Sequence, residues 1–315
     1  MTLPWRTLMK IGIVGGTGFV GSYVVDALLD AGHELRVLTR PGSEHKLSAS
    51  PNCTAVPGNV ANEDDIRACL TGADAAVYLI GILRELPRQG ITFDAMQRRG
   101  AERTIAVAEA LGLSRFLLMS ANGIDAAETP YQTTKLAAEE RLKASTLQWT
   151  IFRPSVIFGP PRGRMEFCTQ LKNELIDSPL PAPLFFSGLS PLHAGAFRLA
   201  PVHAEDVAKA FATALARDDA IGETYALCGP NSPSWKEILQ ALASASGKSK
   251  LMLPAPALVL EPVAAVLGRF SWFPVTRDQL RMLLAGNTCS DDGLARLGII
   301  GRTFDQTSLH YLTSP

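Results

Sequence analysis

The feature that most constrains the fold is an alternation of short apolar segments with longer segments of helical periodicity. Helical spacing of apolar residues appears in Gly18–Asp30, Ala95–Leu111 and Tyr131–Lys143. The apolar segments are typical of buried strands: Lys10–Val14, Leu35–Thr39, Thr54–Val56, Ala75–Ile80, Arg115–Ser120 and Trp149–Arg153. Strands that alternate with helices pair in parallel, so the sequence predicts an α/β protein with a doubly wound parallel sheet.

A glycine-rich turn directly follows the first of these strands. The residues from Gly15 to Gly21 (GGTGFVG) form a GxxGxxG pattern between a buried strand and an amphipathic helix. Gly15 allows a tight turn, Gly18 lets the backbone approach a pyrophosphate, and Gly21 permits close packing of the helix on the strand. Free N–H groups at the start of the helix would hold the anion. The motif predicts dinucleotide binding, and the alternative is a tight turn without a ligand.

Arg40, directly after the second strand, bears on which dinucleotide is bound. An acidic residue at this position would bond the ribose hydroxyls of NAD, whereas an arginine can pair with a 2′-phosphate. We therefore expect NADP(H) to be favoured over NAD(H). The alternative is an ordinary solvated arginine at the end of a strand.

Tyr131 and Lys135 are four residues apart, on one face of the helix before the sixth strand. That helix borders the carboxyl edge of the sheet, where ligands bind in such folds. Lys135 could lower the pKa of Tyr131 and hold the nicotinamide ribose, while Tyr131 passes a proton to or from a substrate oxygen as a hydride moves. The alternative is a half-buried tyrosine beside a surface lysine.

Together these motifs resemble the short-chain dehydrogenase/reductase superfamily, in its extended and atypical branches of the nucleotide-sugar epimerase type. Arg153-Pro154-Ser155 and the segment Pro201–Ala208 add to the resemblance. More narrowly, Phe152–Pro160 (FRPSVIFGP) and Pro274–Gln279 resemble an atypical group that includes the nucleotide-binding accessory subunit of mitochondrial complex I and its bacterial relatives.

The resemblance implies a Rossmann domain with a bound nicotinamide dinucleotide. The implied cofactor contacts are Gly15, Thr17, Gly18, Phe19 and Val20 in the turn, Asn59, Val60, Ile80 and Gly81 after the third and fourth strands, and the segment from Pro154 to Ile157 beside the nicotinamide. Asn59 stands where the family usually carries an aspartate that contacts adenine. An amide can still bond the base.

The candidate catalytic residues are Tyr131, Lys135, Ser120 and Asn122. Extended family members carry a serine or threonine just past the fifth strand to polarise the substrate carbonyl, but here Ser120 ends the strand and Asn122 occupies the usual position. Asn122 can donate a hydrogen bond and cannot relay a proton as serine does. The loop to Tyr131 is also shorter than in sugar-nucleotide epimerases. The family's triad is therefore expected to be incomplete or shifted.

Charge and cysteine usage exclude several classes of function. The 30 basic and 30 acidic side chains cancel, so nucleic acid is not expected as a partner. The five cysteines form no CxxC pair and no histidine has metal-ligand spacing. We therefore expect no disulfide framework, no metal site and a cytoplasmic location. The first ten residues lack the apolar core of a signal peptide, and Met9 is an alternative initiator.

The helical and strand patterns weaken after Pro154 and return at Glu205–Arg217, Thr224–Cys228 and Trp235–Ala245. This predicts a dinucleotide-binding domain at 1–159 with a return segment at 200–228. A smaller, split C-terminal lobe is predicted at 160–199 and 229–315.

Leu251–Phe270 is the most apolar segment of that lobe, and it is interrupted by three prolines and Glu261. A membrane-spanning helix needs about 20 predominantly apolar residues, so we expect a buried or interfacial helix with an extended start. Residues that could join it in an apolar wall over the nicotinamide are Leu184, Phe185, Phe186, Trp272 and Phe273. We expect an apolar substrate (quinone, isoprenoid or acyl compound) or peripheral docking of the lobe on a membrane or protein complex. Simple packing on the core is the alternative.

Two classes of function compete at this point. The first is an oxidoreductase or isomerase that uses Tyr131 and Lys135 on a small, apolar substrate. The second is a non-catalytic nucleotide-binding accessory or assembly protein of a respiratory or quinone-related complex, which Asn122 and the short loop favour. A nucleotide-sugar epimerase or dehydratase is a third reading.

Overall fold

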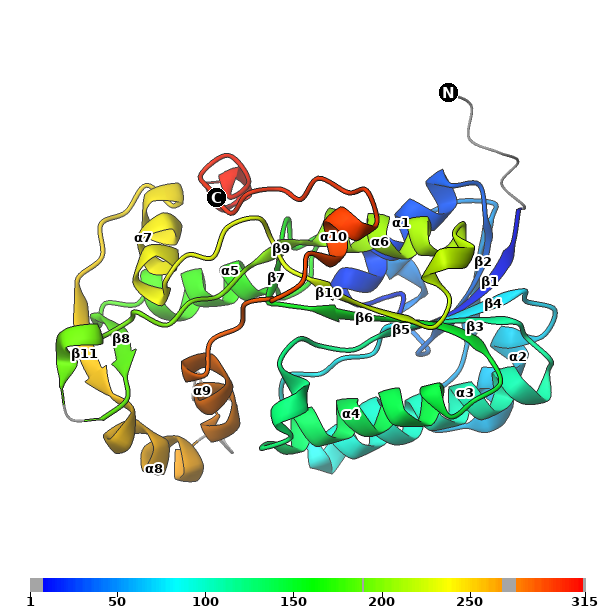
Figure 1. The fold of residues 1–315 in the computed structure, drawn as a ribbon, viewed down its shortest axis with the longest axis horizontal. Coiled ribbons are helices and arrows are strands. Elements are labelled where there is room, and N and C mark those ends of the chain that lie inside the picture. Colours follow the sequence, from blue (N-terminus) through cyan, green and yellow to red (C-terminus); the bar gives the residue numbers. More distant parts are fainter. Residues whose placement is uncertain (1–7, 189, 268–275, 314–315) are drawn as a thin grey trace. The chain divides into compact units, whose positions relative to one another are not determined.

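The computed structural model describes residues 8–188, 190–267 and 276–313, which form two compact units. The first unit consists of Met1–Pro154, Ala204–Leu227 and Asp291–Ile300, and the second of Ser155–His203, Cys228–Ser290 and Gly301–Pro315 (Figure 1). Unlike the boundaries expected from the sequence, the first unit takes in 291–300, and 155–159 belong to the second.

The first unit is built on a seven-stranded parallel sheet of order β10-β6-β5-β4-β1-β2-β3. Its strands are β1 (Lys10–Val14), β2 (Glu34–Thr39), β3 (Cys53–Pro57), β4 (Ala75–Tyr78), β5 (Arg115–Met119), β6 (Gln148–Pro154) and β10 (Glu223–Leu227). All six strands expected from the first half of the sequence are present. The predicted α/β fold with a doubly wound parallel sheet is confirmed.

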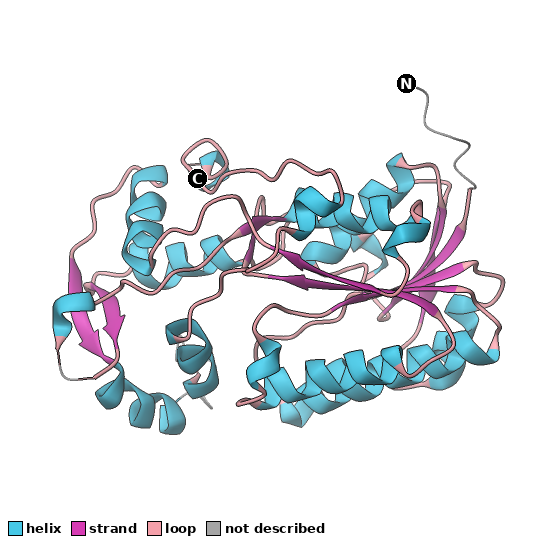
Figure 2. Ribbon diagram, viewed as in Figure 1, coloured by secondary structure: helices cyan, strands magenta, loops and turns pink. Residues whose placement is uncertain are grey.

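Helices cover both faces of this sheet. They are α1 (Phe19–Asp30), α2 (Glu63–Leu70), α3 (Gly100–Ala110), α4 (Pro130–Lys143), α6 (Ala204–Leu215) and α10 (Gly293–Arg296). Helices α1 and α6 lie on one face, and α2, α3 and α4 lie on the other (Figure 1), so that the strands form a middle layer (Figure 2). The late segment belongs here because α10 packs directly on β10: a Cβ at Gly293 would lie 2.4 Å from the Ala226 carbonyl oxygen.

Local capping explains where the helices of this unit begin. The Asn62 side chain accepts a hydrogen bond from the Asp64 N–H and caps α2, whose first turn is acidic, as the helix dipole prefers. Thr129 and Gln132 form a reciprocal capping box at the start of α4, with Pro130 in the first turn. Before α3 the chain forms a π-helical turn, η3 (Asp94–Arg99), where the sequence predicted continuous α-helix.

The second unit contains shorter elements. Its helices are α5 (Phe167–Leu171), which continues into a π-helical turn at Lys172–Ile176, α7 (Trp235–Ala245), α8 (Ala257–Leu267) and α9 (Arg277–Leu284). Its strands pair in parallel, β7 (Ile157–Phe158) with β9 (Val202–His203) and β8 (Ala182–Phe186) with β11 (Met252–Pro256). The core centres on Trp235, whose indole stacks on Phe185 and Phe197 with ring centroids 5.9 and 5.8 Å away.

The apolar segment that begins at Leu251 is not a single helix. Residues Met252–Pro256 form β11, with Pro254 and Pro256 extended as predicted, and α8 then carries Pro262 inside it. Leu258 and Val259 are 68% and 60% exposed. Of the two expected alternatives, a buried helix is therefore wrong at the start of α8, and an interfacial helix stays a prediction. Phe270, Trp272 and Phe273 lie outside the described residues. Among the helices in the described ranges, none combines the length and apolarity that a membrane crossing requires.

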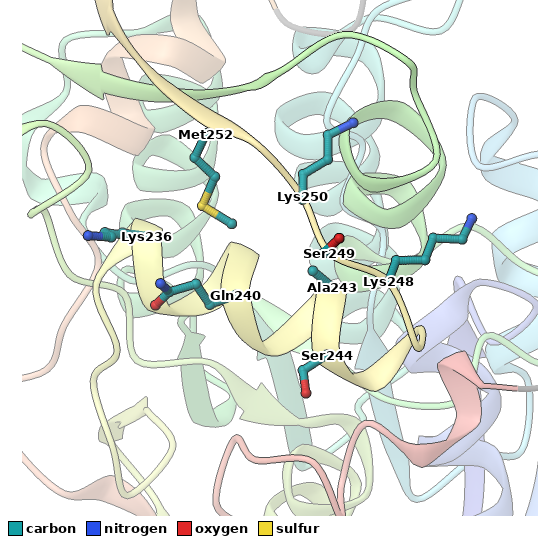
Figure 3. Close-up of a pocket in the computed structure, with 8 residues that line it drawn as sticks. All are labelled: Lys236, Gln240, Ala243, Ser244, Lys248, Ser249, Lys250 and Met252. Carbon is teal, nitrogen blue, oxygen red and sulfur yellow. The ribbon is translucent and has the colours of Figure 1, made fainter.

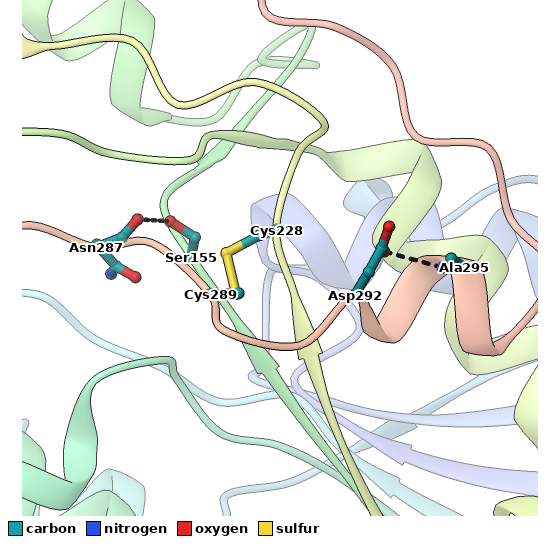
Figure 4. Close-up of a disulfide and its surroundings, with 6 residues drawn as sticks. All are labelled: Ser155, Cys228, Asn287, Cys289, Asp292 and Ala295. Atoms are coloured by element: carbon teal, nitrogen blue, oxygen red, sulfur yellow. Dashed lines mark hydrogen bonds between the residues drawn. A yellow bond between two sulfur atoms is a disulfide. The ribbon is translucent and has the colours of Figure 1, made fainter.

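The expectation of no disulfide is wrong, because Cys228 and Cys289 are bonded to each other (Figure 4). Spacing along the chain could not reveal this pair, since 61 positions separate the two cysteines. The segments that carry the two cysteines both bond to Ala200. The N–H of Gly229, next to Cys228, donates to the Ala200 carbonyl (3.2 Å), and the Ala200 N–H donates to the carbonyl of Asn287, two residues before Cys289 (2.8 Å). The cytoplasmic location stays a prediction, and a disulfide, rare in a reducing cytosol, does not support it.

Candidate functional site

The glycine turn has the backbone geometry that anion binding requires. Gly15 adopts a φ of +95°, and its carbonyl accepts from the Gly18 N–H at 3.2 Å. A Cβ at Gly21 would lie 2.2 Å from the Gly15 oxygen, so α1 can approach the turn only with glycine there. A Cβ at Gly18 would meet nothing closer than 3.4 Å, and no side chain caps α1. The first N–H groups of α1 are thus available to an anion.

The ends of β2 and β3 place two further candidates at the edge of the sheet. Arg40 is exposed directly after the fully buried Thr39. Asn59 is exposed as well, and its side-chain oxygen accepts from the Ala61 N–H at 2.9 Å. Val60 is only 6% exposed and belongs to the hydrophobic core that also contains Tyr78.

Lys135 is buried and joins the ends of two neighbouring strands. Its Nζ donates to the Ile80 carbonyl at 3.1 Å and to the Met119 carbonyl at 2.9 Å. A Cβ on Gly81 would lie 3.5 Å from Nζ, so the chain passes close to the ammonium group. Burial lowers the pKa of Lys135 to about 8, against the opposing charge of Glu139. The alternative of a surface lysine is therefore wrong.

Tyr131 lies one turn before Lys135 on α4 and is half-buried. Its ring packs edge-to-face on Phe93, with centroids 5.8 Å apart. Burial raises the pKa of Tyr131 to about 12. The expectation that Lys135 lowers this pKa stays a prediction. In the described structure its ammonium group donates to the carbonyls of Ile80 and Met119.

Ser120, at the end of β5, carries a buried hydroxyl that lacks a partner. The residue is 3% exposed, and Oγ makes no hydrogen bond within the described ranges. A buried hydroxyl without a partner is costly unless a ligand atom satisfies it. Asn122 is half-buried, and its N–H donates to the Pro154 carbonyl at 2.9 Å. The unpaired oxygen, the uncapped helix start and the open turn fit a nicotinamide dinucleotide with its substrate.

The last two candidates fall in different units. Pro154 ends β6 in the first unit, whereas Ile157 belongs to β7 of the second. In the described part of the chain, no group of three histidine, cysteine, aspartate or glutamate side chains is placed to hold a metal ion.

Sequence reasoning missed the charged network behind Lys135. Arg153 donates to both carboxylate oxygens of Glu139 at 2.8 Å and to Asp125 at 2.8 Å. Glu139 is fully buried and its charge raises the pKa of Arg153. The available signal was a glutamate four residues after Lys135, on the same face of α4.

Comparisons with known proteins agree with this geometry. Residues 15–177 match a family described as NAD(P)H-binding. The chain is 24% identical over 268 residues to the mitochondrial NADH-ubiquinone oxidoreductase 40 kDa subunit of Neurospora crassa, covering 84% of this chain and 67% of the relative. It is 25% identical over 252 residues to ceramide reductase of Caulobacter vibrioides, covering 79% of this chain and 75% of the relative.

Solved structures share the fold at low identity. UDP-glucose 4-epimerase of Thermus thermophilus, in complex with NAD, superposes with a TM-score of 0.73 at 18% identity, covering 97% of this chain and 98% of the other. The corresponding epimerase of Thermotoga maritima gives a TM-score of 0.71 at 16% identity, covering 97% of each chain. The chain therefore belongs to the NAD(P)H-binding family.

Proposed function

We propose that this chain is an NADP(H)-dependent oxidoreductase that acts on the carbonyl group of an apolar compound, with Tyr131 as the proton donor. The observation that carries the proposal is the buried anchor of Lys135 on the carbonyls of Ile80 and Met119, one helical turn from Tyr131. This contact fixes both side chains relative to the carboxyl ends of β4 and β5, where a ligand binds in such sheets.

The residues supply a consistent path for a proton. When bound, the dinucleotide supplies a hydride to the substrate carbon. With a pKa of about 12, Tyr131 is protonated at neutral pH and can donate its proton to the substrate oxygen. The Ser120 hydroxyl can donate a hydrogen bond to that same oxygen. Lys135 has one N–H left beyond its two carbonyl partners, and this donor suits a ribose hydroxyl.

The preference for NADP(H) belongs to the proposal. Arg40 is exposed at the end of β2, where a 2′-phosphate lies when a dinucleotide follows the turn after β1. The remaining site residues keep the roles expected from the sequence: the turn from Gly15 to Gly21 for the pyrophosphate, and Asn59 for the adenine.

Two relatives with lipid names support an apolar substrate. One is the ceramide reductase of Caulobacter vibrioides. The other is a 3-beta-hydroxysteroid dehydrogenase of Mycolicibacterium neoaurum, 28% identical over 123 residues, which cover 37% of this chain and 33% of the relative.

Consumption of NADPH by the purified chain tests this proposal. The panel contains long-chain ketones and a short-tailed quinone. UDP-glucose is incubated separately and its sugar products are analysed, because an epimerase would convert it without net consumption of NADPH. We expect turnover with an apolar carbonyl compound and a kcat roughly 100-fold lower for Tyr131→Phe, with the Kd for NADPH unchanged. Thr133→Ala, an exposed change on the same helix, is the matched control and should act as wild type. An unaffected Tyr131→Phe variant, or no turnover at all, contradicts the proposal.

A second candidate function, a nucleotide-binding accessory subunit docked on a membrane, is favoured by one surface of the second unit. Leu251, Leu253, Leu258 and Val259 are between 49% and 68% exposed. In the same unit, a pocket of about 390 Å³ is lined by three lysines, Lys236, Lys248 and Lys250 (Figure 3). Lys248 pairs with Asp177, and Lys250 donates to the Ser178 carbonyl. Lysines and exposed leucines together suit an anionic lipid surface.

Flotation with anionic and neutral vesicles separates this candidate from the first. Docking predicts flotation with anionic vesicles only, reduced by Leu251→Ser and Leu253→Ser together. Leu192→Ser, on a residue that is 81% exposed in the same unit, is the control. Absence of flotation with either vesicle counts against docking.

A further inference from the structure

The segment that follows β4 is a fixed structure and not a loose connection. Leu86 and Ile91 exchange backbone hydrogen bonds of 2.7 and 3.2 Å around a single helical turn, Pro87–Gln89. The Glu85 carboxylate accepts from the Phe93 N–H at 2.7 Å. We call Gly81–Phe93 the β4 segment.

Contacts at three points tie the β4 segment to α4, the helix that carries Tyr131. Directly before the segment, the Ile80 carbonyl accepts from Lys135 Nζ. Near its start, Gln97 of η3 donates from Nε2 to the Ile82 carbonyl at 2.8 Å, and Gln97 Oε1 accepts from the Thr134 hydroxyl of α4 at 3.0 Å. At its end, the Phe93 ring packs on Tyr131.

Gln97 lies within the π-helical turn η3, from which its side chain reaches both Ile82 and Thr134. It is 1% exposed, and both ends of its amide have partners, as burial of a polar group requires. The turn is itself held from below, since the buried Tyr78 hydroxyl donates to the Met96 carbonyl. π-helical turns occur frequently at functional sites.

The β4 segment also exposes apolar side chains. Leu83 is 58% and Leu86 is 40% exposed. In the described part of the first unit, the only other large apolar side chains that are similarly exposed are Leu8 and Ile300, so half of this group lies in one short segment. The β4 segment thus carries two exposed leucines and ends at the phenylalanine that packs on Tyr131, an arrangement that a ligand with a hydrocarbon part would cover.

We propose that Leu83, Leu86 and Phe93 bind the hydrocarbon part of the ligand and hold its polar end at Tyr131. The β4 segment is then the element that selects a carbonyl compound with an alkyl or acyl chain. This inference rests on the proposed function, because it names the substrate class of the same site. Phe93 then contacts both the hydrocarbon chain of the ligand and Tyr131. Gln97 is a positioning residue, because it acts only through its contact with the β4 segment.

Photo-crosslinking tests the inference directly. The probe is a long-chain methyl ketone with a diazirine at the far end of the chain, irradiated on the full chain with NADP⁺ bound and mapped by peptide mass spectrometry. We expect labels within 82–93. Labelling should be about tenfold weaker in the Leu83→Ser and Leu86→Ser double variant, because the variant loses the apolar contacts that both leucines make when the ligand covers them. Leu192→Ser, in the second unit, is the matched control and should label as wild type.

The outcomes separate this inference from the proposed function. The Kd for NADPH should be the same in the double variant as in the wild type, and an unchanged Kd shows that the variant folds. If the double variant does not fold, the single variant Leu83→Ser replaces it. Tyr131→Phe should label as wild type while turnover falls. Labels confined to 251–259, or labels that the double variant leaves unchanged, overturn the inference even if the enzyme turns over. Labels at 82–93 without any turnover uphold it and overturn the oxidoreductase.

Discussion

The two units reach order by different means. In the first, strands of four to seven residues pair in one parallel sheet, and buried apolar residues fill both of its faces. In the second, pairs of strands as short as two residues are supplemented by an aromatic stack and a disulfide. Short strand pairs are marginal by themselves. The comparison teaches that the second unit depends on a covalent link where the first depends on its sheet.

Removal of the disulfide should have the largest effect on stability. If it had none, the second unit would not depend on its covalent link and the contrast between the two units would be wrong. The disulfide closes a loop between positions 61 apart, which stabilises by about 4 kcal/mol. Cys228→Ser should lower the free energy of unfolding by that amount and raise hydrogen exchange within 228–289, not in the central sheet. A reducing agent should lower the free energy of unfolding of the wild type by the same amount as the substitution does, and should leave the variant unchanged. Equal stability of both proteins under oxidising conditions would contradict the prediction.

Substitutions at two glycines of the turn test how far the stability of the first unit depends on close packing of α1 on the turn. Gly21→Ala places a Cβ 2.2 Å from the Gly15 carbonyl oxygen, so we expect a loss of about 2 to 3 kcal/mol of stability by urea unfolding. Gly18→Ala meets nothing closer than 3.4 Å and should fold normally, while its NADPH affinity falls in calorimetric titration. If both variants were equally stable, the close packing of α1 on the turn would not be essential.

Lys135 makes the stability of the first unit rise with pH. Its pKa is about 8 in the folded state against 10.5 ordinarily, so the unfolded state binds more protons between these values and stability rises with pH there. Relative to Lys135→Met, the wild type should gain about 2 kcal/mol between about pH 7 and about pH 10. Urea unfolding at both pH values measures this. Lys143→Met, at an exposed position of α4, is the control and should follow the wild type.

Arg40→Ala is the smallest expected effect. Loss of the guanidinium should weaken NADPH binding about tenfold and leave NADH binding unchanged, because only NADPH carries the 2′-phosphate. Calorimetric titration of both cofactors measures the difference. Arg67→Ala, which removes an exposed arginine paired with Glu63 in α2, should preserve the preference. Equal affinities in the wild type would refute the assignment of Arg40.

The sequence predicted the first unit well because its signals are local. Apolar runs and the glycine turn each lie within a few residues of the element that they define. The pairing of β8 with β11 could not be read in the same way. Pro254 and Pro256 in β11 argue against a strand, and they are tolerated because β11 pairs with a single neighbour.

The site shows the same limit. Spacing was enough to place Tyr131 and Lys135 on one helical face. Nothing in the spacing showed that the Ser120 hydroxyl is buried without a partner, or that Phe93 packs on Tyr131, because both depend on contacts between separate elements. Gln97 depends on a π-helical turn, which regular helical periodicity does not predict.

The division of the first unit into three stretches of chain has a consequence for its synthesis. Until β10 emerges from the ribosome, β6 is an open edge of the sheet, and such edges promote association between nascent chains. The buried Arg115 guanidinium and Thr150 hydroxyl also acquire the carbonyls of Ala214 and Ala220 only at that stage. A nucleotide-binding fragment that stops at Pro154 is therefore expected to aggregate, whereas one that reaches Leu227 can complete its sheet before release.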